Sequence, residues 1–467
     1  MRNFINRVKE LEFLNKKFNS KQAELIILYG RRRIGKTELV LKFCENKEYM
    51  YFMGRLESKE DTLKRFNNLL IEKFNDKKLL NSPLHNWDSI FDYINEKSKK
   101  RIVLVIDEFP FIADRSPEII SIIQDNWDSK LKDSNIMMIL LGSSISMMEK
   151  YALDYKSPLY GRRTGQWKID KMSINHLKDF FPNYNMEDIL KIYSCLDSIP
   201  GYLTKFSHDK SPYDNIEEKM FTKGEFLYEE IEVLLREEFR DPSNYMSILS
   251  SVAGGLTTFN DIYNRTNLDK SLLSKYLNVL ENLGIVEKIV PITESYKSKL
   301  KAKGALYSLK DNFFNFWFRF VYLNKQELEK GNSKLILNNI KNEIEGYVSR
   351  KFEDFAIELL SIADIKEFNK IGKWWDKEKE IDIVALNDSK KEIIFGECKW
   401  QNNVETMKLL NELKENANRI KWNLNKRKEV YMLFAKSFNK KVKEFEGNEV
   451  YCFDLEDMGR ILNIKNL

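Results

Sequence analysis

The chain has 467 residues, of which 43% are hydrophobic and 32% charged, with 77 Lys and Arg against 71 Asp and Glu. At roughly 100–200 residues per domain, this length predicts about three domains. An aromatic share of 13%, with only 18 Gly and 9 Pro, excludes a fibrous or wholly disordered polymer. The net charge of +6 is small, so any affinity for nucleic acid must come from a local patch.

The apolar runs are too short for a membrane protein. The longest, residues 136–141 and 103–106, fall well below the roughly 18 residues of a membrane helix, and the N-terminal segment is charged throughout. We therefore expect no membrane span, no signal peptide and a cytoplasmic location. The 4 Cys and 3 His are scattered without a C-x-x-C pair, which argues against a disulfide scaffold and a His/Cys zinc site.

The N-terminal part alternates strands and helices. The strands, apolar on both faces, are predicted at residues 24–30, 101–106 and 135–141, and the helices at 88–97 and 117–132. Buried strands separated by helices are typical of an α/β fold with a doubly wound parallel sheet. We assign residues 1–168 to this core.

A glycine-rich loop follows the first strand and opens a helix. The loop is Gly30-Arg31-Arg32-Arg33-Ile34-Gly35-Lys36-Thr37, which fits the pattern G-x-x-x-x-G-K-[ST]. Free backbone N–H groups at the start of a helix can hold phosphate oxygens, and this context disfavours the alternative of a Gly-rich turn without a ligand. We expect Lys36 to reach the β- and γ-phosphates of a nucleotide and the Thr37 hydroxyl to bind Mg²⁺.

Two carboxylates end the next apolar strand. Asp107 suits the Mg²⁺ shell and Glu108 suits orientation of an attacking water, because phosphoryl transfer requires mainly positioning and charge neutralisation. Having both favours hydrolysis over binding alone. The strand after that ends in Ser143 and Ser144, where a hydroxyl could sense the γ-phosphate or simply form a turn.

Residues 169–236 keep a helical period without a clear strand, which predicts a helical lid. Residues 237–310 then follow the order of a winged helix-turn-helix. Its helices are predicted at 244–252, 259–266 and 270–283, with a two-strand pattern over 285–309.

The winged helix carries most of the net charge of the chain. Residues 265–310 hold nine Lys and Arg against four Asp and Glu. The expected recognition helix has a polar face with Ser271, Ser274, Lys275 and Asn278, and the hairpin has Lys297, Lys299, Lys301 and Lys303 at period two. This favours contacts with DNA phosphates, for which the alternative is a protein-docking or intramolecular lid module.

The aromatic segment at residues 311–339 is interpreted as a linker helix packed in a core, with a partner surface as the alternative. A last domain over 340–467 is predicted to have a helix at 340–360, strands near 373–375, 381–386, 392–398 and 429–435, and a helix at 406–420.

Charged side chains are expected to gather in this last domain. Glu397 and Lys399 are two apart on one strand and therefore point the same way, and the preceding strand can bring Asp382 beside them. Together with Glu353 on the helix, these carboxylates predict a Mg²⁺ site, with Lys399 assisting hydrolysis of a phosphodiester. The alternative is an inactive relic, or a solvated edge strand with an accidental charge pair.

Two family resemblances follow from these motifs. The runs FINRVKELEFL, LYGRRRIGKTELV, VLVIDEFPF, LLGSS and SPLYGRRTGQW resemble archaeal P-loop ATPases of the AAA-related signal-transduction type. That resemblance implies Arg162 as a finger for the γ-phosphate, and Pro200 matches the family's Gly-Gly-Ile-Pro stretch, although Asp197 and Ser198 replace its glycines. The run EIDIVA with FGECKW resembles the PD-(D/E)xK restriction-endonuclease-like superfamily, without the Pro that often precedes Asp382.

Together these observations predict an ATP- and Mg²⁺-dependent ATPase whose nucleotide state controls DNA binding or DNA cleavage. The competing hypothesis is a signalling switch whose C-terminal domains bind protein partners and cut nothing. A finger supplied by a neighbouring protomer would imply a homo-oligomer.

Overall fold

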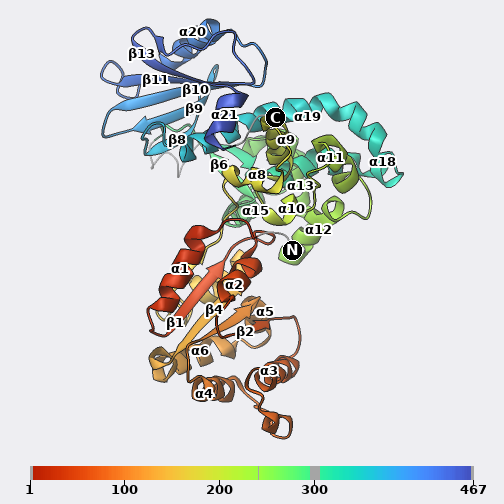
Figure 1. Cartoon of the computed structure of the whole chain (residues 1–467). Coiled ribbons are helices and arrows are strands. Elements are labelled where there is room, and N and C mark those ends of the chain that lie inside the picture. The colour runs from red at the N-terminus through yellow and green to blue at the C-terminus, as the bar shows by residue number, and fades with distance from the viewer. Residues whose placement is uncertain (1–3, 240, 295–304, 464–467) are drawn as a thin grey trace. The chain divides into compact units, whose positions relative to one another are not determined.

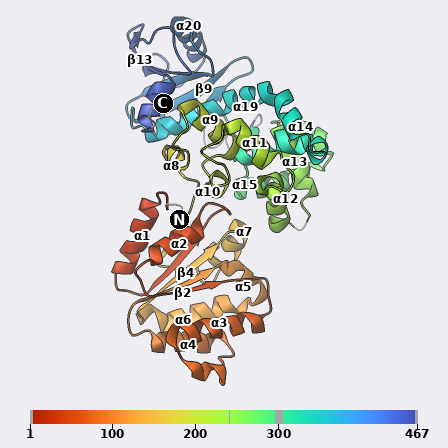
Figure 2. The ribbon, with the colours of Figure 1, turned by 45° about the vertical axis from the view of Figure 1, so that its right-hand side comes forward.

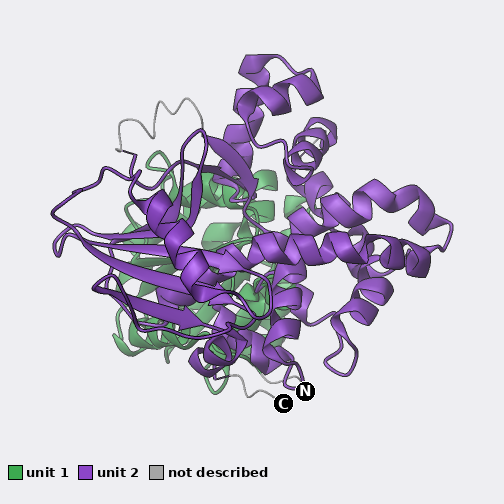
Figure 3. Cartoon of the chain, turned by 90° about the horizontal axis from the view of Figure 1, so that it is seen from above, with its two compact units in different colours: residues 1–172, 199–201 green, residues 173–198, 202–467 purple. Residues whose placement is uncertain are grey.

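The computed structural model describes residues 4–239, 241–294 and 305–463 (Figure 1). The chain forms two compact units, residues 1–172 with 199–201 and residues 173–198 with 202–467 (Figure 3). Over the described residues, no helix has the length and apolar character needed to cross a membrane.

Unit 1 is built on a five-stranded sheet in the order β2-β3-β4-β1-β5, with every pair parallel. The strands are β1 (Glu24–Tyr29), β2 (Tyr49–Met53), β3 (Ile102–Asp107), β4 (Ile136–Gly142) and β5 (Gly165–Lys168). The three central strands were predicted and are confirmed. The two edge strands were not predicted, because part of each strand is exposed and neither forms a continuous buried run.

Helices cover both faces of this sheet, as the predicted doubly wound fold requires (Figure 2). α1 (Val8–Asn19) and α2 (Lys36–Cys44) lie on one face. On the other face, alternate strand residues such as Leu104 and Leu140 pack against Phe66 and Ile90 in one apolar core. The helices there are α3 (Lys59–Phe74), α4 (Trp87–Lys97), α5 (Phe109–Arg115) and α6 (Glu118–Ser129), and the short turns of the unit are η1 (Lys77–Leu80), η2 (Leu131–Asp133), α7 (Ile145–Met148) and η3 (Glu149–Leu153).

Helices follow the sheet of unit 1 in the chain, and no strand occurs in residues 169–236, all of which are described. This agrees with the predicted helical segment. The elements are η4 (Ile174–His176), α8 (Leu177–Phe180), α9 (Met186–Leu196), α10 (Pro200–Leu203), α11 (Pro212–Met220) and α12 (Phe226–Glu238).

Three helices and a two-stranded antiparallel sheet come next, in the predicted order of a winged helix. They are α13 (Ser243–Ala253), α14 (Phe259–Thr266), α15 (Lys270–Asn282), β6 (Val286–Ile289) and β7 (Leu306–Leu309). The polar face of α15 is exposed, Lys275 included. The expected DNA-binding residues Lys297, Lys299, Lys301 and Lys303 lie outside the described residues.

The aromatic segment is core, as predicted. It forms α17 (Asn312–Phe316), η5 (Trp317–Val321), η6 (Tyr322–Asn324) and α18 (Lys325–Glu329). Phe313, Phe316, Trp317 and Phe318 are 0% exposed, and the Trp317 indole N–H donates to the Tyr228 carbonyl at 2.8 Å. Burial of these rings leaves no aromatic partner surface here.

The C-terminal part is a six-stranded mixed sheet in the order β12-β13-β11-β10-β9-β8, preceded by the long helix α19 (Ser333–Ile362). β10 pairs antiparallel with β9 and parallel with β11. The elements are β8 (Lys370–Trp375), β9 (Glu380–Asn387), β10 (Glu392–Lys399), α20 (Thr406–Ala417), β11 (Lys428–Ala435), β12 (Glu444–Phe445), β13 (Asn448–Phe453) and α21 (Leu455–Ile461). β12, β13 and α21 were not predicted. In β13 only two side chains are buried, so this strand gives no continuous apolar run in the sequence.

Candidate functional site

The glycine-rich loop joins β1 to α2 in unit 1. Gly35 has φ +87°, a left-handed conformation that glycine adopts without strain, and it forms the N-cap of α2. Lys36 is 5% exposed, and its ammonium group donates to the carbonyl oxygens of Gly30 at 2.8 Å and Arg31 at 2.9 Å. The loop therefore surrounds a buried cation at the N-terminus of a helix, a combination that suits phosphate.

The two N-terminal motifs meet at one carboxylate. Thr37 Oγ1 donates to Asp107 Oδ2 at 2.7 Å, and Asp107 is 1% exposed. The hydroxyl of Tyr51 donates to the same oxygen at 2.7 Å, and the Glu108 backbone N–H donates to Asp107 Oδ1 at 2.8 Å. The Mg²⁺ roles expected of Thr37 and Asp107 require the two side chains to be close, and the contact meets that requirement, so these two residues can hold Mg²⁺ beside bound phosphates.

Glu108 has an unusual backbone at the end of β3. Its φ of +48° lies in the left-handed region, and a Cβ added to Gly54 would lie 2.4 Å from the Glu108 carbonyl oxygen. Glycine at position 54 therefore admits this conformation. The backbone N–H of Ser143 lies 3.3 Å from Glu108 Oε2 and donates to it, so the contribution of Ser143 here comes from its main chain. The Ser144 hydroxyl lies 3.2 Å from that of Ser146.

Two residues outside the glycine-rich loop donate hydrogen bonds to its backbone carbonyl groups. Arg7 is 5% exposed, and its guanidinium donates to the carbonyls of Ile34 at 2.7 Å and Asp170 at 2.9 Å. The Gly201 N–H donates to the Arg33 carbonyl at 2.8 Å, one residue after Pro200. Sequence reasoning assigned no role to Arg7 or Gly201, because the contacts join segments that are far apart in the chain.

Arg162 does not join this group. Its guanidinium pairs with Asp128 at 2.8 Å, in the last turns of α6. Gly165, which begins β5, is opposite Ile26 near the start of β1, whereas the loop follows the other end of β1. Arg162 thus lies near the amino edge of the parallel sheet, and the glycine-rich loop lies at the carboxyl edge.

A second group of charges lies in the C-terminal sheet of unit 2. The Cys398 N–H donates to Asp382 Oδ2 at 2.9 Å, which confirms that β9 brings Asp382 beside β10. Lys399 Nζ lies 2.7 Å from Glu397 Oε1, as two residues on one face of a strand should. Glu397 Oε2 is buried and has no hydrogen-bond partner among the described residues.

Electrostatics tie these carboxylates to Glu353 of α19. Burial, followed by repulsion from Glu397 and Glu353, raises the pKa of Asp382 to about 8. Burial is also the main cause that raises the pKa of Glu397 and of Glu353. The charge of each neighbouring acid therefore disfavours ionisation of Asp382 and Glu397.

A second lysine accompanies the cluster. Lys373 Nζ lies 2.7 Å from Glu353 Oε2 and 3.3 Å from Asp354 Oδ1. Sequence reasoning missed Lys373 and Asp354, although a basic residue in a short strand opposite an acidic helix was a usable signal. In the described ranges, no three His, Cys, Asp or Glu side chains are arranged so as to hold a metal. Glu353, Asp382 and Glu397 are coupled electrostatically but do not converge on one point.

The base of the wing contacts the same strand. The Ile292 N–H donates to the Lys373 carbonyl at 3.0 Å, and a Cβ on Gly372 would lie 3.3 Å from the Ile292 side chain. Glu287 of β6 has a pKa raised by burial and then by the charge of Asp354. The winged helix and the carboxylate cluster therefore share an interface within unit 2.

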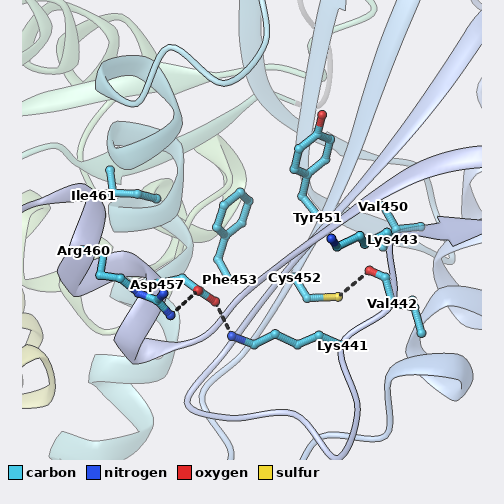
Figure 4. Close-up of a pocket in the computed structure, with 10 residues that line it drawn as sticks. All are labelled: Lys441, Val442, Lys443, Val450, Tyr451, Cys452, Phe453, Asp457, Arg460 and Ile461. Atoms are coloured by element: carbon cyan, nitrogen blue, oxygen red, sulfur yellow. Dashed lines mark hydrogen bonds and ion pairs between the residues drawn. The ribbon is translucent and has the colours of Figure 1, made fainter.

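A pocket of about 390 Å³ lies elsewhere in the C-terminal domain (Figure 4). The Cys452 thiol donates to the Val442 carbonyl at 3.7 Å, and Arg460 pairs with Asp457 at 3.0 Å. Its lining is Lys441, Val442, Lys443, Val450, Tyr451, Cys452, Phe453, Asp457, Arg460 and Ile461. None of the functional residues predicted from the sequence lines this pocket.

The whole chain has a close relative. It is 36% identical over 462 residues to the uncharacterized protein MJECL04 of Methanocaldococcus jannaschii, covering 97% of this chain and 99% of that one. The chain belongs to the same family as that protein. A shorter relative in the same organism, the uncharacterized ATP-binding protein MJ0423, is 64% identical over 45 residues, 10% of this chain and 76% of that protein.

Family profiles match three separate parts of this family member. Residues 4–206 match an ATPase domain predominantly from Archaea, residues 246–288 match the bacterial regulatory proteins of the arsR family, and residues 317–419 match archaeal and bacterial proteins of unknown function. The structure resembles the Walker-type ATPase PABY2304 of Pyrococcus abyssi, with a TM-score of 0.52 and 19% identity over 68% of this chain and 96% of that one. Unit 1 therefore has the P-loop NTPase fold, and the third profile leaves the C-terminal activity open.

The raised pKa of Asp382 predicts a pH-dependent cost to stability. Its folded pKa of about 8 lies above the ordinary value of 3.8, so the native state binds an extra proton and loses stability as the pH rises from about 4 to 8. Asp382→Asn removes that loss and can still accept from Cys398. We expect its Tm to exceed that of the wild type at pH 8, by about 1–2 °C per kcal/mol relieved in a unit of this size, but not at pH 4.

Asp388→Asn is the matched control, because Lys370 lowers the pKa of this exposed carboxyl. Thermal unfolding followed by circular dichroism at both pH values measures the effect. A Tm difference for Asp382→Asn that is the same at pH 4 and pH 8 would contradict the assignment.

Proposed function

We propose that the protein binds and hydrolyses ATP with Mg²⁺ and that its nucleotide state controls binding to DNA. The observation that carries the ATPase part is the 2.7 Å contact between Thr37 and Asp107, which joins both phosphate-binding motifs at the carboxyl edge of the sheet. Ligands of open α/β sheets bind at that edge. The match of residues 4–206 to an archaeal ATPase domain supports the same conclusion.

Each residue of this site has a distinct role in the proposal. Lys36 neutralises the β- and γ-phosphates, while Thr37 and Asp107 hold Mg²⁺, which supplies charge neutralisation when bound. Glu108 accepts from the attacking water and orients it. In this proposal Arg162 has no role in the ATP site of its own subunit. If Arg162 instead acts as an arginine finger in the site of a neighbouring protomer, ATP turnover per subunit depends on protein concentration.

The roles of Lys36 and Glu108 separate in two variants. Lys36→Ala should lose nucleotide binding, because it removes the cation that faces the phosphates. Glu108→Gln should bind ATP like the wild type and lose turnover by about 100-fold or more, because only the transition state needs the water to be oriented. Fluorescent-nucleotide titration and phosphate release measure the two effects.

Lys42→Ala is the control for loss of a lysine on α2, since Lys42 is exposed and pairs with Glu45 at 2.8 Å. It should bind and turn over ATP normally. Full turnover by Glu108→Gln would remove Glu108 from the proposal.

DNA is the proposed partner of the winged helix. The arsR-type match at residues 246–288 covers α14 and α15, and the exposed polar face of α15 presents Lys275. The local excess of positive charge over residues 265–310 suits phosphate contacts, which position a protein on a duplex without reading its sequence.

Salt dependence tests this contact. If Lys275 meets a phosphate, Lys275→Ala should lower the slope of log affinity against log salt by about 0.9 for duplex DNA. Lys64→Ala, which removes an exposed lysine from helix α3 of unit 1, should leave the slope unchanged. Fluorescence anisotropy at several salt concentrations gives both slopes, and equal slopes for the two variants would exclude a phosphate contact by Lys275.

A second candidate activity is metal-dependent DNA cleavage by the C-terminal domain, as in the PD-(D/E)xK superfamily. The mutual repulsion of Asp382, Glu397 and Glu353 favours it, because a divalent cation relieves the repulsion through hard oxygen ligands. Lys399 beside Glu397 would stabilise charge on the scissile phosphate. Side-chain movement must first bring the three acids together.

Cleavage should depend on both metal and lysine. We expect nicking of plasmid DNA in Mg²⁺ or Mn²⁺ that is lost in Asp382→Asn and in Lys399→Ala, with DNA affinity retained in the latter because the carboxylates remain. Lys370→Ala, a charge removal at the exposed end of β8, is the control. If the full chain with ATP leaves duplex, single-stranded and branched DNA intact in both metals, the signalling switch replaces the nuclease.

A further inference from the structure

Tyr51 is the residue that the nucleotide-site motifs do not explain. It lies on β2, opposite Val105 of β3, and its hydroxyl donates to Asp107 Oδ2 at 2.7 Å. That oxygen also accepts from Thr37 at 2.7 Å. One oxygen of a buried carboxylate thus takes two hydroxyl donors from two different elements, α2 and β2.

The hydroxyl groups of Thr37 and Tyr51 have different roles in the proposed reaction. Thr37 would have a second task, because its hydroxyl would give a lone pair to Mg²⁺ while its proton still donates to Asp107. Tyr51 belongs to no phosphate-binding motif and can keep its bond. With Oδ1 held by the Glu108 N–H at 2.8 Å, Tyr51 fixes the second oxygen and hence the rotamer of Asp107.

We propose that Tyr51 is a positioning residue that holds the Asp107 carboxylate in the orientation needed for the Mg²⁺ of the nucleotide site. It acts through Asp107 and does not touch the nucleotide. This inference rests on the proposed binding of a magnesium nucleotide to unit 1.

The chemistry of the hydroxyl is consistent with a permanent donor. An ordinary phenol already carries its proton in the neutral range, so the 2.7 Å contact has Tyr51 as the donor. A hydrogen bond to a charged acceptor is stronger than a neutral one, so its loss should be measurable in the affinity for the metal.

The test replaces only the hydroxyl. Tyr51→Phe keeps the ring and its packing, and Tyr49→Phe is the matched control, because Tyr49 lies two residues earlier on the same strand and is 39% exposed. Mn²⁺ affinity in the presence of ADP, followed by electron paramagnetic resonance, reports on the metal without requiring catalysis. Nucleotide affinity in EDTA is measured on the same samples.

We expect Tyr51→Phe to weaken Mn²⁺ binding about five- to tenfold and to raise the Mg²⁺ concentration for half-maximal ATP turnover similarly, with nucleotide affinity in EDTA unchanged. Tyr49→Phe should match the wild type in all three. Mn²⁺ affinity equal to that of the wild type in Tyr51→Phe would overturn the inference, as would an equal loss of metal-free nucleotide binding, which indicates a general structural role.

Failure of the proposed function gives a different result. If the wild-type protein binds nucleotide but does not hydrolyse it, the ATPase proposal is wrong. The Mn²⁺ measurement then still decides the role of Tyr51. A wild-type protein that binds no nucleotide overturns both.

Discussion

The buried carboxylate of Asp107 is the constraint around which unit 1 is organised. Burying a carboxylate that is only 1% exposed costs free energy unless hydrogen-bond donors surround it. Asp107 has three such donors, which are Thr37 of α2, Tyr51 of β2 and the backbone N–H of the next residue, Glu108. These bonds require β2 to lie beside β3 and the N-terminal end of α2 to approach the end of β3. Gly54 directly follows β2 and lies close to the Glu108 carbonyl, and its N–H donates to the Asp107 carbonyl at 2.7 Å, so the residue proposed to orient water lies beside the segment that follows Tyr51.

The parts of this unit that sequence could predict are those with strong local signals. The central strands are continuous apolar runs, and the loop from Gly30 to Thr37 has a defined spacing, so both were predicted at nearly the right boundaries. Edge strand β2 alternates exposure, and its role depends on a contact 56 residues away in sequence, between Tyr51 and Asp107. The contact of Arg7 with Ile34 was missed for the same reason.

In the C-terminal cluster, most of the residues could be predicted from local strand patterns, and one contact between distant segments was missed. Alternation on a strand correctly placed Glu397 with Lys399, and strand pairing brought Asp382 to Cys398. What spacing could not supply was Lys373, which takes up one oxygen of Glu353 through a long-range ion pair. Burial of these acids beside one another destabilises their charged forms, so their repulsion is a cost to folding.

Lys373 also links the two functions proposed for unit 2. Its side chain neutralises Glu353, while its carbonyl accepts from Ile292 at the base of the wing. The same lysine lies 3.3 Å from Asp354 Oδ1, so it neutralises two neighbouring acids of α19. Because the side chain of Lys373 pairs with the acid and its backbone accepts from the base of the wing, this one residue joins the winged helix to the carboxylate cluster within unit 2.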